Sequence, residues 1–164
     1  MEKLENYDEY KKMKNSKYSN NDIKLYFLIK YGYMININEF DERLKREEQD
    51  KFRNDLLERF NNKCILTGTS TVQACHIIPY SETKDMSIEN GLLMNSHHHN
   101  IFDSYDLSIN PKTLCIEISN KYKDDIFTTN CLRRIDILEQ YVKVVENLSY
   151  HYDKFLKKNE NNII

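Results

Sequence analysis

The segment 71–103 constrains the fold more than any other part of the chain. Residues 71–78 are rich in β-formers and precede Pro79, so they predict a strand with His76 near its end. Residues 87–91 predict a turn into a second, apolar strand at 92–94, and a short helix follows. We therefore expect two strands and a helix in succession, with His76 held by the sheet and open to a loop.

The helix expected after the second strand carries two side chains that can bind one cation. Asn95 or Ser96 caps its first turn. His99 and Asp103 are four residues apart, so they share one face of the helix. An imidazole and a carboxylate placed in this way can hold a divalent ion and leave its other positions to water or phosphate oxygens.

Helices are expected on both sides of this segment. Residues 41–60 carry apolar side chains on one side with charges between them, which predicts an amphipathic helix. A shorter helix is expected at 21–31, with Gly32 as its stop, and a β-hairpin is expected at 107–118. From Asn130 onward, apolar residues recur at intervals of three and four, which predicts a long C-terminal helix.

Together these elements indicate an α+β fold, which we interpret as a single domain in three parts. Residues 1–40 form a polar, helical extension, residues 41–119 form the core with its preceding helix, and residues 120–164 form a helical segment that packs on the core. The apolar stripe of the C-terminal helix is expected to serve core packing. A homodimer interface through this helix is the alternative.

The apolar residues are too scattered for a membrane protein. No run is long enough to span a bilayer, and the first residues lack the hydrophobic segment of a secretion signal. We therefore expect an intracellular, cytoplasmic protein with no membrane partner, whose four cysteines are reduced thiols. The net charge of −2 argues against a generally polybasic protein that coats nucleic acid.

Four short sequence motifs in the central segment occur in the same order as in a known family. They are CILTG at 64–68, ACHIIP at 74–79, NGLLM at 90–94 and HNIFD at 99–103. The pattern resembles the HNH endonucleases, or ββα-metal nucleases, and most closely the HNH domain of restriction-type enzymes. The resemblance covers residues 52–109 and implies a ββα-metal core of hairpin and helix between flanking N- and C-terminal helices.

This resemblance also implies a role for each residue that carries it. His76 would activate water as the general base, and Asn90 would hold the His76 backbone through hydrogen bonds across the loop, although a plain turn at Asn90 is the alternative. His99 and Asp103 would hold a divalent metal, with Mg²⁺ expected and Mn²⁺ or Zn²⁺ as alternatives. The expected activity is hydrolysis of phosphodiester bonds in DNA by a metal-dependent endonuclease, and RNA remains open as a substrate.

The central segment is acidic, which bears on how it would meet a nucleic acid. Residues 64–119 contain six acidic residues, two lysines and no arginine. A bound cation and basic residues in the flanks would therefore have to supply the contacts to phosphate. The candidates for nucleic-acid binding are Arg53, Arg59, Lys63, Arg133 and Arg134. Their alternative use is in ordinary mixed-charge helix surfaces.

Cys75 departs from the pattern of many HNH nucleases, which have Asp or His immediately before the base. A thiol is a poor ligand for Mg²⁺ and suits Zn²⁺. We interpret Cys75 as a small buried residue, and a structural zinc half-site formed with Cys64 is the alternative. The rival to the enzyme is a non-catalytic, nucleic-acid-binding or zinc-stabilised HNH-like module.

Overall fold

The computed structural model describes the backbone of residues 2–160 and the side chains of residues 6–160. Contacts divide the chain into two compact units, Met1–Asp50 and Lys51–Ile164. The boundary lies inside helix α3 (Ile37–Arg59), so its first residues belong to one unit and its last residues to the other. The three-part division expected from the sequence, with boundaries after residues 40 and 119, stays a prediction.

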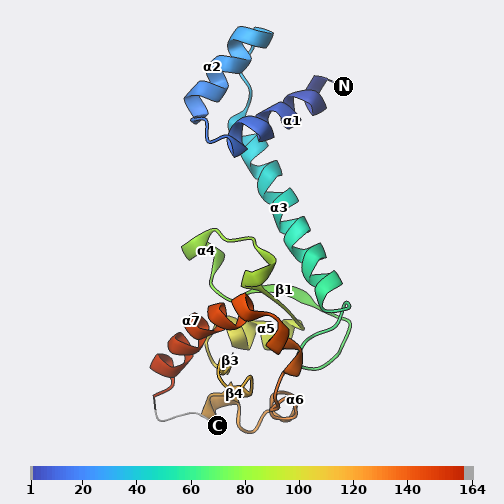
Figure 1. Ribbon diagram of the computed structural model, residues 1–164, viewed down its shortest axis with the longest axis vertical. Coiled ribbons are helices and arrows are strands. Elements are labelled where there is room, and N and C mark those ends of the chain that lie inside the picture. Colours follow the sequence, from blue (N-terminus) through green and yellow to red (C-terminus); the bar gives the residue numbers. More distant parts are fainter. Residues whose placement is uncertain (1, 161–164) are drawn as a thin grey trace. The chain divides into compact units, whose positions relative to one another are not determined.

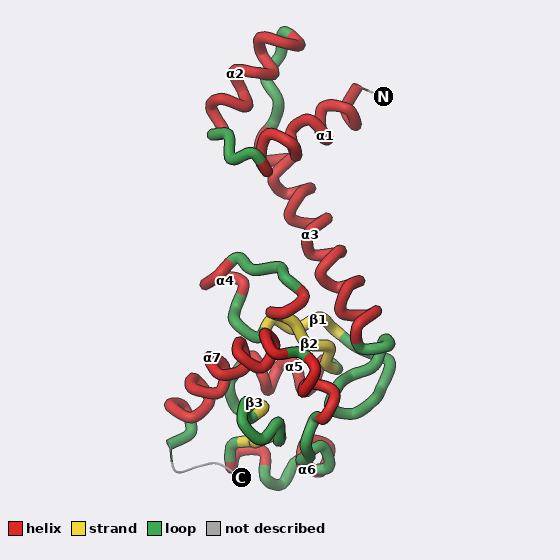
Figure 2. Tube along the Cα trace, in the orientation of Figure 1, coloured by secondary structure: helices red, strands yellow, loops and turns green. Residues whose placement is uncertain are grey.

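In the described part of the chain, helices alternate with two small antiparallel sheets (Figures 1 and 2), which is the α+β class expected from the sequence. The α-helices are α1 (Glu2–Asn15), α2 (Asn20–Tyr31), α3, α4 (Tyr80–Thr83), α5 (Ser96–Asp103), α6 (Ile126–Thr129) and α7 (Val142–Lys158). The strands are β1 (Gln73–His76), β2 (Gly91–Met94), β3 (Leu107–Ile109) and β4 (Ile116–Ile118), and the last two form the predicted second hairpin. Short 3₁₀ turns are η1 (Ile88–Asn90), η2 (Asn120–Tyr122) and η3 (Asp136–Gln140). Within residues 2–160, no helix combines the length and the apolar character needed to cross a membrane.

The first unit consists of α1, α2 and the first part of α3. The Ser19 hydroxyl accepts a hydrogen bond from the backbone N–H of Asp22, so this residue caps α2 and the helix begins slightly before the predicted range. Gly32 ends α2 with a φ of 75°, as predicted. The core of this unit contains Tyr7, Tyr10, Ile23, Phe27, Ile35 and Ile37.

The second unit contains a hairpin of β1 and β2, followed directly by α5 (Figure 2). The two strands are antiparallel, and His76 lies opposite Gly91. Asn95 caps α5, because its side-chain oxygen accepts a hydrogen bond from the backbone N–H of His98 at 2.9 Å. The succession of strand, strand and capped helix agrees with the prediction.

The last turns of α3 pack across this hairpin at Gly91. A Cβ atom on Gly91 would lie 2.7 Å from side-chain atoms of both Phe52 and Leu56, closer than two carbon atoms can approach. Phe52 and Leu56 are buried in the same core as β2. The missing side chain of Gly91 therefore lets α3 lie close to the end of the strand that carries His76.

The C-terminal helix is shorter than the sequence indicated. Residues 133–135 pair with β4 and with the residues just before it, through N···O distances of 3.0 and 2.8 Å. Backbone held in this extended pairing cannot adopt helical dihedral angles. The prediction of an α-helix from Asn130 was therefore wrong for residues 130–141, and α7 begins at Val142.

Most of the apolar stripe in the C-terminal segment is buried within the chain itself. Ile135, Leu138, Leu148 and Phe155 are buried, and α7 contacts β3, η1 and η3. Val142, by contrast, is 66 % exposed. The stripe thus serves mainly to cover the core, as expected, and a homodimer through this helix stays a prediction.

Candidate metal and catalytic site

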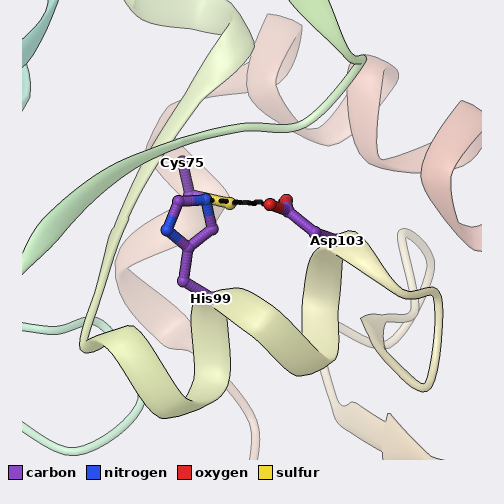
Figure 3. Close-up of side chains that lie close together, drawn as sticks. All are labelled: Cys75, His99 and Asp103. Carbon is purple, nitrogen blue, oxygen red and sulfur yellow. Dashed lines mark hydrogen bonds and ion pairs between the residues drawn. The ribbon is translucent and has the colours of Figure 1, made fainter.

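Three side chains that can bind a metal ion meet between β1 and α5 (Figure 3). They are Cys75 from the strand and His99 and Asp103 from the helix. The His99 Nε2 atom lies 3.2 Å from Asp103 Oδ2, and the Cys75 Sγ atom lies 3.8 Å from Asp103 Oδ1. One donor atom from each residue lies within 4.8 Å of the others. The helix thus brings His99 and Asp103 together as their spacing indicated, and the strand adds a thiol.

Gln73 fixes the orientation of the His99 ring. Its Oε1 atom lies 2.9 Å from His99 Nδ1. An amide oxygen only accepts hydrogen bonds, so this contact places a hydrogen on Nδ1 and directs Nε2 toward Asp103. Gln73 and Cys75 are two residues apart in β1, which puts their side chains on the same face of the strand. One strand face therefore supplies both the thiol and the partner of His99.

Cys75 is fully buried, as the sequence predicted. Burial raises the pKa of its thiol, and the negative charge of Asp103 acts in the same direction. Without a cation, Cys75 is therefore a neutral thiol that donates a weak hydrogen bond to Asp103. Cys64 belongs to no group of three or more metal-binding side chains in the described part of the chain. The zinc half-site of Cys64 and Cys75 thus gains no support.

His76 is held by an aromatic stack. Its ring lies nearly parallel to the ring of Phe52, with centroids 4.4 Å apart and planes inclined by 12°. The Nε2 atom is buried and has no hydrogen-bond partner among the described residues. Burial lowers the pKa of the imidazole, and the charge of Asp103 partly offsets this effect. The ring is thus mostly neutral at neutral pH, the state that a general base requires.

A cavity of about 360 Å³ connects the base candidate to the two candidate cation ligands. Its wall includes His76, His99, Asp103, Tyr80, Tyr105 and His151. A water molecule occupies about 30 Å³ in the liquid, so the space exceeds that of several waters. His76 and the two candidate ligands on α5 therefore face one space in which a hydrated ion and a phosphate group could meet.

Asn90 ties the loop after His76 to the second strand. Its side-chain oxygen accepts a hydrogen bond from the Ile78 backbone at 2.8 Å, and its Nδ2 donates to the Ile78 carbonyl at 2.9 Å. The Asn90 carbonyl also accepts from the Ile77 backbone at 2.9 Å. The side chain is buried, so these bonds are shielded from water. Such contacts are what the orienting role implied by the resemblance requires.

His151 lines the cavity but was not singled out from the sequence. Its Nδ1 lies 2.9 Å from the Ser108 hydroxyl, and its Nε2 lies 2.9 Å from the Phe102 carbonyl. Burial lowers the pKa of this imidazole to about 4, so the neutral ring donates to the carbonyl and accepts from the hydroxyl. The available signal was its spacing in α7, three residues after Leu148 and four before Phe155, which places it on the buried stripe.

The other two histidines of the central run have partners outside the metal cluster. His98 is buried, and its Nδ1 lies 2.9 Å from Asn95. His97 places Nε2 2.8 Å from an Asp125 carboxylate oxygen. These contacts join α5 to its N-terminal cap and to the segment around α6, so they position the helix that carries His99.

The arginines proposed to bind nucleic acid make contacts within the second unit. Each arginine donates a hydrogen bond to a backbone carbonyl. Before the four sequence motifs, Arg53 donates to Val72 at 3.2 Å and Arg59 to Ile88 at 3.0 Å. After them, Arg133 donates to Leu66 at 3.0 Å and Arg134 to Thr113 at 3.2 Å. The fifth candidate, Lys63, is exposed, and its ammonium group has no hydrogen bond or ion pair with another described residue. A role in nucleic-acid binding stays a prediction for all five.

A model of the HNH endonuclease family matches residues 64–110. The matched segment contains His76, Asn90, His99 and Asp103, and it includes the whole of the β1–β2 hairpin and α5. The resemblance seen in the four sequence motifs is thereby confirmed for this segment, and it supports a nuclease-type function. A comparison with curated proteins found no match.

Proposed function

We propose that the second unit is a divalent-metal-dependent HNH endonuclease that hydrolyses phosphodiester bonds in DNA. In this proposal β1, β2 and α5 are the ββα-metal core. The observation that carries the proposal is the cavity that His76 shares with His99 and Asp103. A neutral imidazole and two side chains that can bind a cation border this one space, which supports metal-assisted hydrolysis.

His76 is proposed to act as the general base. The ring borders the cavity and is held neutral by burial, so one of its nitrogens can take a proton from a water molecule there. The stack on Phe52 limits rotation of the ring, so the nitrogen keeps one direction. Asn90 acts through the loop: its three hydrogen bonds to Ile77 and Ile78 keep the end of the strand in place.

His99 and Asp103 are proposed to hold the divalent ion. Gln73 keeps the His99 ring in the tautomer whose Nε2 can coordinate, as outer partners of metal-bound histidines commonly do. The Asp103 side chain is 57 % exposed, so the ligand pair is open to solvent and substrate on one side. A bound divalent ion would supply positive charge to the phosphate and to the departing oxygen.

DNA is the proposed substrate, and RNA is the alternative for the same chemistry. Neither the hairpin nor α5 offers a cation to the phosphates, so the contacts that supply affinity must come from elsewhere on the surface. The five flanking cations named above are the candidates for this source, and Lys63 is favoured among them because its ammonium group has no hydrogen bond or ion pair with another described residue.

A cleavage assay with two histidine variants tests this function. The protein should convert supercoiled plasmid to nicked or linear forms when a divalent ion is present, and a chelator should prevent this. His76→Ala should lower the cleavage rate by about two to four orders of magnitude while metal affinity stays unchanged. His99→Ala should weaken metal binding, so that added metal restores part of its activity. Recovery of the His76 variant by metal would reverse the assignment of base and ligand.

A non-catalytic module is the second candidate, and one observation favours it. Cys75 stands in the metal cluster with a buried thiol, and a thiol suits zinc held for structure. The same assay separates the two functions. A module of this kind would bind metal and nucleic acid, and neither plasmid nor RNA would be cut at any concentration of Mg²⁺, Mn²⁺ or Zn²⁺.

A further inference from the structure

We propose that Cys75 is a third metal ligand, bound as a thiolate, and that it makes this site prefer Zn²⁺ and similar borderline-soft ions over Mg²⁺. The inference rests on the proposed function, because it concerns the ion held by His99 and Asp103. It departs from the expectation that Cys75 only fills space and that Mg²⁺ is the natural ion.

Two of the distances in this cluster are close to those that a small tetrahedral ion requires. Bonds of about 2.0 to 2.3 Å to zinc place its ligands roughly 3.3 to 3.7 Å from one another. The observed separations are 3.2 Å between His99 Nε2 and Asp103 Oδ2 and 3.8 Å between Cys75 Sγ and Asp103 Oδ1, and one donor atom from each residue lies within 4.8 Å of the others. The thiol therefore lies at ligand distance from the carboxylate before any ion is present, and small side-chain rotations can complete the site.

The strand holds the sulfur in this place. Cys75 pairs with Leu92 in the centre of the hairpin, and its side chain is fully buried on the face that also bears Gln73. Gln73 binds the second ligand, His99. The same strand face thus supplies one ligand and orients another, so the positions of Cys75 and His99 are coupled through β1.

Charge and chemistry both favour a soft ion at such a site. A thiolate and a carboxylate together balance the two positive charges of the metal, and the imidazole adds a neutral donor. Binding releases the thiol proton to solvent as the sulfur–metal bond forms. Mg²⁺ prefers oxygen ligands in octahedral geometry, so it would bind Asp103 and water and leave the sulfur unused. Zn²⁺ and Co²⁺ would use all three side chains.

Cobalt provides a readout that does not depend on activity. The full-length protein, freed of metal with a chelator, is titrated with Co²⁺ while the near-ultraviolet absorption of a thiolate-to-cobalt charge transfer is recorded. The band should appear for the wild type, and it should be absent in Cys75→Ser and in Asp103→Ala. Cys115→Ser is the matched control and should keep the band, because Cys115 lies outside the cluster. Asp103 is largely exposed, so its replacement tests the cluster even if the buried Cys75 variant fails to fold.

Calorimetry gives the second half of the test. The Zn²⁺ affinity of Cys75→Ser should be lower than that of the wild type by at least about 10- to 100-fold, because removal of even an outer partner of a metal ligand causes a loss of this size. The Mg²⁺ affinity should stay unchanged. Cobalt binding without the charge-transfer band, or equal Zn²⁺ affinities for wild type and Cys75→Ser, would overturn the inference and leave the His99–Asp103 site intact. Absence of all divalent-ion binding would instead overturn the proposed function together with it.

Discussion

His76 and Phe52 lie with their rings stacked, 4.4 Å between centroids, although one comes from the end of a strand and the other from a helix. The contact exists because Gly91, opposite His76 in the hairpin, leaves room for the Phe52 ring. The direction of the base candidate therefore depends on a helix from which no described residue lines the cavity.

Replacing Phe52 by leucine should reduce cleavage without unfolding the protein. Leucine keeps an apolar side chain in the core, but it cannot stack on the imidazole, so His76 gains rotational freedom. A misplacement of about 1 Å can cost as much as 100-fold in rate, and we expect a loss of about 10- to 100-fold. Metal affinity measured by calorimetry should not change. A fall in metal affinity equal to the loss of activity would point to a general disturbance of the site instead.

Gly91→Ala should destabilise the second unit by about 1–3 kcal/mol, the usual cost of overpacking a core. The new methyl group would meet both Phe52 and Leu56 at 2.7 Å, and both side chains are buried. Denaturant unfolding measures the change. In the double variant Gly91→Ala/Phe52→Leu the smaller side chain should recover part of the loss, since the two positions are in contact. Strictly additive effects would show that the contact does not cause the destabilisation.

Local sequence signals predicted the part of the site that the chain builds from neighbouring residues. The i, i+4 spacing placed His99 beside Asp103, and Pro79 together with the β-formers placed His76 at a strand end. These features depend on one helix turn or one strand, so periodicity reveals them. The role of Asn90 was indicated only by the resemblance to the family, because an asparagine before a glycine equally indicates a simple turn.

Features that depend on packing between distant segments were not predictable in this way. The stack of Phe52 on His76 and the place of His151 in the cavity wall join residues far apart in the chain. The interruption of the C-terminal helix has the same origin. Ile135 begins an apolar spacing that suits a helix, but residues 133–135 form hydrogen bonds with Leu114 and with Ile116 of β4, which keep them extended.

Acid should destabilise the second unit through His151. Its pKa is about 4 in the folded protein against 6.5 for the ordinary group, so the unfolded chain binds more protons between these values. The free energy of unfolding is therefore highest above pH 6.5 and falls as the pH is lowered toward 4, by up to about 3 kcal/mol from this residue. Burial lowers the pKa of His76 and His98 as well, and these groups act in the same direction.

The variant His151→Gln isolates this contribution. Glutamine can still donate to the Phe102 carbonyl, but it does not titrate. The free energy of unfolding of the variant, measured with denaturant, should depend less steeply on pH between 6.5 and 4 than that of the wild type. The difference in slope should correspond to the uptake of up to about one proton fewer on unfolding. An unchanged slope would mean that His151 keeps its ordinary pKa in the folded protein.

Lys63 and Arg133 should respond differently to alanine, although both were proposed to contact nucleic acid. The Lys63 ammonium group is exposed and has no polar partner among the described residues, so Lys63→Ala should leave the melting temperature unchanged. Removal of one phosphate contact should lower the slope of the logarithm of DNA affinity against the logarithm of salt concentration by about one.

Arg133 donates to the Leu66 carbonyl at 3.0 Å, so Arg133→Ala should lower the free energy of unfolding by about 1.5–3 kcal/mol, as for a hydrogen bond from a charged group. It should leave the salt slope unchanged. Fluorescence anisotropy with labelled duplex DNA across a salt series, together with thermal unfolding, measures both quantities. If Arg133→Ala lowers the slope while Lys63→Ala does not, the DNA lies against the face that carries Arg133, and the contact with Leu66 is given up on binding.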